Sequence, residues 1–223
     1  MPIDTLSTCA FCGHAENPGH TKVRERMFGM GDEFSIVSCA RCLSIQLLDV
    51  PSDLGIYYPG NYYAHKKLVT SSTGRKLLKY IRYSLFARTG LESLKPIFGD
   101  WMTKTGTGRN AAIADIGCGN GQLLYEMHAA GFGNLRGYDP YLEQEKDLAP
   151  GLSLHRKSIF EIEEKFDLLM MHHSFEHMAN PREVLGKAYQ ILAKRGTLLI
   201  RVPVADAEVW STEGACWVQI DAP

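Results

Sequence analysis

The sequence predicts an α/β fold, in which a parallel sheet carries helices on both faces, preceded by a small cysteine-rich domain. Three observations support this prediction. Short apolar runs alternate with amphipathic stretches of helical length from residue 111 to residue 202. A glycine-rich turn joins the first of these runs to the first helix. Two Cys-x-x-Cys pairs occupy the first fifth of the chain.

Length and composition fit one sizeable core with a small appendage. The chain has 223 residues, of which 45% are apolar and 22% charged, and its formal net charge is −1. Such a charge gives no global field that would attract nucleic acid or an anionic membrane. No apolar run approaches the roughly 20 residues of a membrane span, and the N-terminus lacks the layout of a secretion signal. We therefore expect a cytoplasmic protein.

The first pair, Cys9 and Cys12, and the second pair, Cys39 and Cys42, are separated by 26 residues. This spacing predicts a tetrahedral, all-cysteine zinc site in a ribbon formed by residues 1–50. Disulfides conflict with the expected compartment, and a thioredoxin-like redox pair would follow a strand within a βαβ unit. Four protein ligands leave no open coordination position, so the metal is expected to be structural.

Residues 51–108 are predicted to form a helical lid or linker. Their first part, Tyr57–Tyr63, holds four tyrosines around a Pro-Gly turn, which could contact a substrate or pack between the domains. Apolar residues recur at helical spacing over Leu77–Leu85, among several arginines and lysines. A solvated basic face is favoured over a surface that binds a membrane or an anionic substrate.

The core, residues 109–223, contains the alternating elements. Five strands are expected, at Ala111–Ile116, Leu135–Tyr138, Leu152–His155, Phe166–Met171 and Thr197–Val202. Helices are expected at Gly121–Ala130, over a short stretch at 141–149 that ends at Pro150-Gly151, and at Pro181–Ala193. In the ribbon, Phe34–Ser38 and Ser44–Leu48 alternate enough to form short strands.

The turn after the first core strand has glycine at alternate positions, 117, 119 and 121. Glycine suits such a turn because a side chain would keep a ligand away from the backbone, and because the turn often requires positive φ. Asp115 stands just before the turn, and Asp139 ends the second strand. A carboxylate at that second strand end can accept both hydroxyls of a ribose. The pattern therefore indicates a nucleoside-containing ligand.

The spacing of the glycines distinguishes between ligands. A dinucleotide fingerprint has a third glycine where this chain has Gln122, which disfavours an NAD-dependent dehydrogenase. The pattern D-x-G-x-G-x-G resembles motif I of the class I S-adenosylmethionine (SAM) methyltransferases. The likeness to that family continues almost throughout residues 113–204. It implies a Rossmann-like sheet, a turn that passes beneath the methionine moiety, and SAM as cofactor.

The resemblance also implies which residues bind the cofactor. Motif I and the ribose-binding acid match well, whereas the adenine contacts match more loosely, since the family more often has aspartate where this chain has Ser158. His172, after the fourth strand, would form a wall of the cofactor site. The expected cofactor-binding residues are Asp115, Gly117, Cys118, Gly119, Gly121, Asp139, Pro140, Ser158, Ile159, Phe160 and His172.

The stretch His173-Ser-Phe-Glu-His177, with Asn180-Pro181, resembles an "EH…P" stretch of the small-molecule branch of that family. An acceptor must lose a proton before or during attack on the methyl group, and histidine does this best near neutral pH. His173, Glu176 and His177 are therefore the candidate catalytic residues. The alternative is that Glu176 and His177 only stabilise the loop and helix through hydrogen bonds.

The predicted function is methyl transfer from SAM to an oxygen, nitrogen or carbon of a small molecule, such as a sugar or another metabolite. The four cysteines followed by Tyr57–Tyr63 resemble a subset that includes sugar C-methyltransferases. The alternative is a non-catalytic zinc-ribbon module that recruits a protein or nucleic acid on a degenerate methyltransferase core. Only residues 204–223 follow the fifth strand and its Pro203, so we expect the core to lack the family's last two strands and a partner chain to cover the open sheet edge.

Overall fold

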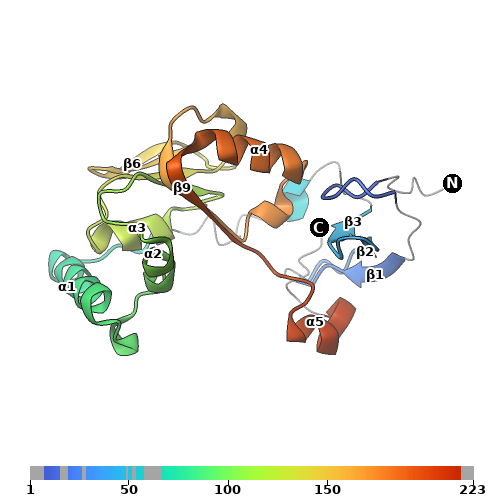
Figure 1. Cartoon of the computed structure of the whole chain (residues 1–223), viewed down its shortest axis with the longest axis horizontal. Coiled ribbons are helices and arrows are strands. Elements are labelled where there is room, and N and C mark those ends of the chain that lie inside the picture. The colour runs from blue at the N-terminus through green and yellow to red at the C-terminus, as the bar shows by residue number, and fades with distance from the viewer. Residues whose placement is uncertain are drawn as a thin grey trace. The chain divides into compact units, whose positions relative to one another are not determined.

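A computed structural model describes residues 8–15, 20–26, 29–48, 50–51, 54–57 and 67–216. The chain divides into two compact units (Figure 1). The core unit contains Asn61–Phe175 and Val184–Arg201. The ribbon unit joins three segments that are distant in sequence: Met1–Gly60, Glu176–Glu183 and Val202–Pro223.

The core unit is built on a six-stranded sheet with the order β6-β7-β5-β4-β8-β9. Every neighbouring pair is parallel except β6 and β7, which are antiparallel. The strands are β4 (Ile113–Ile116), β5 (Leu135–Tyr138), β6 (Lys146–Ala149), β7 (Leu152–His155), β8 (Phe166–His172) and β9 (Leu192–Arg201). The central strand β4 is buried along its whole length, as expected for a strand covered on both faces.

Helices lie on both sides of this sheet. The elements α1 (Thr73–Thr89), α2 (Gly99–Thr105) and α3 (Gln122–Ala129) lie on one side, and α4 (Pro181–Ile191) lies on the other (Figure 1). Short 3-10 helices are η3 (Glu92–Leu94), η4 (Ile159–Glu161) and η5 (Phe175–His177). Side chains of β4, β5 and β8 pack with those of α1–α3 in one large apolar cluster. The predicted α/β fold with helices on both faces is confirmed.

The prediction of a helical stretch over 141–149 is wrong. Residues Lys146–Ala149 form β6, an antiparallel edge strand in which Ala149 pairs with Leu152. Pro150-Gly151 is therefore the turn of a hairpin and not a helix stop. Gly151 has φ +78°, and a Cβ at this position would lie 2.0 Å from the Gly133 carbonyl oxygen. The close approach of two backbones, which no local pattern indicates, requires the glycine.

The last core strand begins earlier than predicted. It runs from Leu192, directly after α4, and therefore includes Arg195-Gly196, a dipeptide typical of a turn that lies between the predicted helix and strand. Arg195 does have positive φ, 71°, but the chain remains paired to β8 through an irregularity between Phe166 and Leu168. The turn signal therefore marks a bulge within a strand.

The ribbon unit contains an antiparallel three-stranded sheet: β1 (His20–Arg24), β2 (Glu33–Ser38) and β3 (Ile45–Leu47). The predicted strands at 34–38 and 44–48 are confirmed as β2 and β3. The strand β1 was not predicted, because Val23 is its only buried residue and its apolar alternation is weak.

The C-terminal segment packs on this small sheet. Trp210, of α5 (Glu208–Glu213), and Ala215, of η6 (Gly214–Cys216), contact the cluster formed by Val23, Phe34, Ile36 and Tyr57. Apolar packing from residues 202–216 thus enlarges a core that the ribbon alone could hardly form at its size.

Tyr57, at the end of η1 (Leu54–Tyr57), is buried, and its hydroxyl donates to Asp32 Oδ2 at 2.8 Å. That hydrogen bond, burial and the Asp32 charge raise the pKa of Tyr57. The other three tyrosines of the cluster, Tyr58, Tyr62 and Tyr63, lie outside the described residues, as does the segment Trp217–Pro223. Among the helices that the structure describes, none combines the length and apolar character needed to cross a membrane.

Candidate functional site

The glycine-rich turn connects the end of β4 to α3 and bends through left-handed backbone. Gly117, Gly119 and Gly121 have φ of 77°, 51° and 77°. Two reasons for glycine at 117 coincide: the positive φ and the close approach of Ser174, whose Cβ would lie 2.4 Å from a Cβ at Gly117. The Ser174 hydroxyl donates to the Ile116 carbonyl at 2.7 Å, which joins the ends of β4 and β8.

Asp139, at the end of β5, points its carboxylate at this turn. Its Oδ2 accepts the Gly119 N–H at 3.0 Å, and its Oδ1 accepts the Tyr141 N–H at 2.9 Å. Each carboxylate oxygen has a second lone pair, so both can still accept a hydroxyl. The structure therefore brings together the turn and the acid that the sequence analysis paired, and Pro140 follows them on the surface.

Asp115 lies in the middle of β4 and is buried. Within the described part of the chain, its Oδ1 has no hydrogen-bond partner. Burial, and then the nearby charge of Asp139, raise the pKa of Asp115 to about 8. A protonated carboxyl at neutral pH follows, which is a hydrogen-bond donor beside the anionic Asp139. Burial and the two acids also raise the pKa of the Cys118 thiol, which is therefore not nucleophilic.

The expected adenine-contacting residues lie at the start of η4. The Ser158 side chain accepts the Glu161 N–H, and the Glu161 carboxylate accepts the Ser158 N–H at 2.7 Å. This capping box gives Ser158 a structural role in setting the turn. Ile159 is buried, whereas Phe160 is 50% exposed and its ring is available to a ligand.

The end of β8 carries two histidines with different environments. The His172 ring lies against Trp101 of α2, with 4.3 Å between ring centroids, and neither ring nitrogen has a partner among the described residues. Burial, with the charges of Arg201 and His173, lowers the pKa of His172 to about 4, so this ring stays neutral and is only a weak base at neutral pH. His173 is exposed, has φ of 50°, and donates its N–H to the Arg201 carbonyl at 2.9 Å.

Glu176 and His177 lie on η5 and belong to the ribbon unit, whereas His173 and the glycine turn belong to the core unit. The chain turns twice between β8 and α4, with positive φ at His173 and at Asn180. Pro181 then begins α4, a position that suits proline because its missing N–H has no helical partner.

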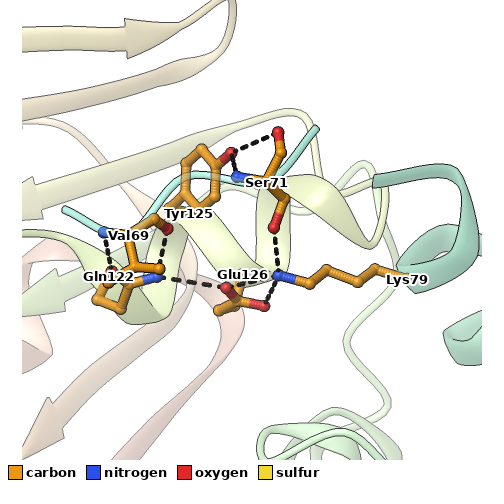
Figure 2. Close-up of polar contacts among 6 residues, drawn as sticks. All are labelled: Val69, Ser71, Lys79, Gln122, Tyr125 and Glu126. Carbon is orange, nitrogen blue, oxygen red and sulfur yellow. Dashed lines mark hydrogen bonds and ion pairs between the residues drawn. The ribbon is translucent and has the colours of Figure 1, made fainter. Parts of the chain in front are cut away.

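A polar network on α3 escaped the sequence analysis (Figure 2). The Gln122 side chain accepts the Val69 N–H at 2.8 Å and donates to the Val69 carbonyl at 3.1 Å. The Tyr125 hydroxyl accepts the Ser71 N–H at 2.7 Å. Gln122, whose presence argued against a dinucleotide, thus fixes the segment before α1 along the first turn of α3.

Lys79 of α1 completes this network. Its ammonium donates to Ser71 Oγ at 2.9 Å and pairs with the Glu126 carboxylate at 2.6 Å (Figure 2). Both charged side chains are 30% exposed, so solvent screens the pair only in part. No sequence pattern signals the pair with Glu126, because the two residues are 47 positions apart.

The four cysteines of the two pairs converge in the ribbon unit. Their Sγ atoms all lie within 4.8 Å of one another, with 3.7 Å between Cys9 and Cys42 and 3.6 Å between Cys12 and Cys39. A tetrahedron with Zn–S bonds of about 2.3 Å has edges of about 3.8 Å, whereas a disulfide requires about 2.05 Å. The thiols therefore fit one tetrahedral metal ion and not disulfides.

The two Cys-x-x-Cys turns have the same backbone geometry. In each, the first cysteine donates its N–H to the carbonyl five residues on, at 2.8 and 2.9 Å, and accepts the N–H four residues on. Gly13 and Leu43, which follow the second cysteines, have positive φ of 70° and 62°. Only one of these two positions carries glycine, so glycine spacing alone would have missed the equivalence.

Second-layer hydrogen bonds favour thiolates in this cluster. The Gln46 side chain donates to Cys9 Sγ at 3.2 Å, and the Arg41 N–H donates to Cys39 Sγ at 3.4 Å. The Ser44 hydroxyl, 2.6 Å from Cys42 Sγ, is the main cause that lowers the pKa of Cys42 to about 6. Zinc binds thiolates, so these donors suit the metal.

A family model described as "Methyltransferase domain" matches residues 85–220, which is more than half of the chain. The chain therefore belongs to this methyltransferase family, and the resemblance found in the sequence is confirmed.

Among curated proteins, the chain is similar to tRNA U34 carboxymethyltransferases. It is 30% identical over 112 residues to that of Helicobacter pylori strain G27, covering 44% of this chain and 43% of the relative. It is 29% identical over 112 residues to that of Helicobacter acinonychis strain Sheeba, with the same coverage. The chain thus spans less than half the length of these relatives.

Solved structures show a weaker likeness. The plantazolicin methyltransferase BpumL in complex with SAH is 18% identical over 66% of this chain and 60% of that chain, with a TM-score of 0.40. The amino pentose methyltransferase CalS10 from Micromonospora echinaspora, with SAM bound, is 18% identical over 62% of this chain and 61% of that chain, with a TM-score of 0.35. At these TM-scores the two structures add nothing to the family assignment.

Proposed function

We propose that the chain is a SAM-dependent methyltransferase that acts on a small molecule such as a sugar or another metabolite. The observation that carries the proposal is the contact between Asp139 and Gly119. It sets a carboxylate with free lone pairs beside a turn of left-handed glycines at the carboxyl ends of β4 and β5. Ligands of open α/β sheets bind at this edge.

In this proposal, the glycine turn and Asp139 hold the adenosyl and ribose parts of the cofactor. Asp139 accepts the ribose hydroxyls. The protonated Asp115 carboxyl, whose Oδ1 has no partner among the described residues, donates inside the turn. Cys118, Pro140, the segment Ser158–Phe160 and His172 line the remainder. The cofactor, when bound, supplies an electrophilic methyl group, and the protein has to hold the acceptor in line and exclude water.

His173, Glu176 and His177 remain the candidates for removing the acceptor's proton. His173 is supported by its exposed position at the end of β8, beside the buried Ser174 that contacts the turn. His172 is assigned no proton transfer, because its lowered pKa makes the neutral ring a weak base near neutral pH.

A small acceptor is favoured over tRNA by the charge of the chain. A net charge of −1 gives no global field that would attract a polyanion, whereas tRNA binding depends strongly on phosphate contacts. The similarity to tRNA U34 carboxymethyltransferases makes tRNA the competing acceptor, and the two are separated by whether methyl transfer from SAM is seen with sugars or with tRNA.

The same proposal assigns Zn²⁺ to Cys9, Cys12, Cys39 and Cys42 as a structural ion. The support is the spacing of the four sulfur atoms and the hydrogen bonds that favour thiolates. The proposal includes a cytoplasmic location, where reducing conditions keep the four thiols available to a metal.

Calorimetry with SAM tests the proposal. Asp139→Ala removes charged hydrogen bonds worth about 1.5–3 kcal/mol, so we expect SAM affinity to fall at least tenfold. Asp147→Ala, which removes an exposed acid from the edge strand β6, is the matched control and should bind as the original chain does. Equal affinities in the Asp139 variant and the control would remove the assigned ribose contact. Binding of NADH in place of SAM would instead favour the dehydrogenase alternative.

A further inference from the structure

The carboxyl ends of β8 and β9 carry a cluster in which only His172 belongs to the proposed cofactor site. His172 and Arg201 are the last residues of the two strands and are paired in register, so their side chains lie on the same face of the sheet. Trp101 of α2 packs against both. The Arg201 guanidinium carbon lies 4.7 Å from the Trp101 ring centroid, and the His172 ring lies 4.3 Å from it.

Arg201 differs from the other arginine of the core unit that stacks on aromatic rings. Arg109 lies over Tyr80 and Tyr83, but its N–H groups donate to the Ala130 and Tyr80 carbonyls and to Ser84 Oγ. Arg109 thus has three of its five N–H donors engaged by the protein, which gives it a structural role. Arg201 is exposed, and within the described part of the chain its guanidinium has no acid and no hydrogen-bond acceptor.

Among the residues that the structure describes, no acid forms an ion pair with Arg201. Asp100, next to Trp101 in sequence, pairs with Lys95 at 3.1 Å. The buried His172 ring is neutral at physiological pH and adds no negative charge. A guanidinium that stacks by its face keeps its edge N–H groups available, and the aromatic ring holds it in place. Such a fork matches the geometry of a carboxylate or a phosphate.

We propose that Arg201, held on Trp101, binds an oxyanion of the methyl acceptor, either a carboxylate or a phosphate group. The subsite lies at the carboxyl edge of the sheet, one strand beyond β8 and two beyond the glycine turn that follows β4. The proposal names the acceptor class as anionic, and in that respect it rests on the proposed methyltransferase function.

Anion titration followed by NMR tests this subsite. In the ¹⁵N-labelled chain the indole N–H of Trp101 is identified among three tryptophans by its loss in Trp101→Phe. We expect sodium phosphate or sodium acetate to shift this signal saturably at constant ionic strength, where sodium chloride does not. Saturation by phosphate alone assigns a phosphorylated acceptor, and saturation by acetate assigns a carboxylate.

The arginine variants decide the role of Arg201. Arg201→Gln should weaken the saturating anion at least tenfold, and Arg201→Lys should weaken it less, because charge without the planar fork remains. Arg88→Gln, which removes an exposed arginine from the end of α1, should change nothing. The proposal would be overturned if Arg201→Gln bound the anion as tightly as the original chain does. It would also be overturned if phosphate and acetate shifted the Trp101 signal no more saturably than chloride does.

Calorimetry with S-adenosylhomocysteine separates this proposal from the function on which it rests. The Arg201→Gln variant should bind S-adenosylhomocysteine as well as the original chain, because its side chain lies away from the glycine turn. If the original chain binds the anion but no S-adenosylhomocysteine, the oxyanion site stands and its assignment to a methyl acceptor fails.

Discussion

Gly117→Ala tests whether steric contact with Ser174, and not only backbone conformation, requires glycine in the turn. Alanine at a φ of 77° costs about 1–2 kcal/mol. The new Cβ would also lie 2.4 Å from Ser174 Cβ, so one of the two backbone segments has to move by more than 1 Å. Overpacking of this kind costs about 1–3 kcal/mol. We therefore expect a loss of roughly 2–5 kcal/mol in the free energy of unfolding.

Gly106→Ala is the matched control. This glycine has φ of 67° and nothing within 4 Å of a Cβ position, so the variant incurs only the backbone cost. Urea unfolding followed by circular dichroism compares the two variants. The double variant Gly117→Ala/Ser174→Gly removes the clash and should be destabilised by less than the sum of the single changes. Additive losses, or equal losses at Gly117 and Gly106, would refute the steric argument.

Three further outcomes follow from the structure. Cys12→Ser should abolish zinc binding, whereas Cys216→Ser should retain one zinc per chain by elemental analysis; unchanged zinc in the first variant would exclude the four-cysteine site. The raised pKa of Asp115 means that the stability gained from its protonated form is present below about pH 4 and is lost as pH rises through about 8. Urea unfolding of Asp115→Asn should therefore give a free energy of unfolding that rises relative to that of the original chain between these pH values. A difference between the two proteins that does not change with pH would contradict the raised pKa. Lys79→Met should lower the free energy of unfolding by about 1 kcal/mol, while Lys104→Met, on the exposed face of α2, should not; equal effects would deny the Lys79–Glu126 pair its role.

Several core elements could be predicted from local pattern alone. The strands at Leu135–Tyr138 and Leu152–His155 have the predicted bounds, because each begins at a leucine directly after turn residues, Gly133-Asn134 and Pro150-Gly151. The edge strand β6 could not be predicted in the same way. Its sequence, Lys-Asp-Leu-Ala, is half polar, and Pro150-Gly151 suits a helix end as well as a hairpin.

In the candidate site, too, local features could be predicted from the sequence and contacts between distant segments could not. The glycine turn and the acid at the end of the next strand could be predicted from the sequence, because both follow from the local geometry of a strand, a turn and a helix. The bonds between Gln122 and Val69 were not readable, since the partners are 53 residues apart and are polar groups common on any surface. Trp101 and Arg201, which come together at the sheet edge, were missed for the same reason.

The amino-acid sequence by itself determined the two Cys-x-x-Cys turns, the left-handed glycine turn and the alternation that makes a parallel sheet. Each depends on backbone conformation and hydrogen bonds within a few residues, which side-chain type controls directly. Only the tertiary structure decided that residues 202–216 pack with the ribbon, that Asp115 is buried with its Oδ1 lacking a partner among the described residues, and that Arg201 stacks on Trp101. These contacts join segments distant in sequence, so they depend on the path of the whole chain and on which apolar faces remain to be covered.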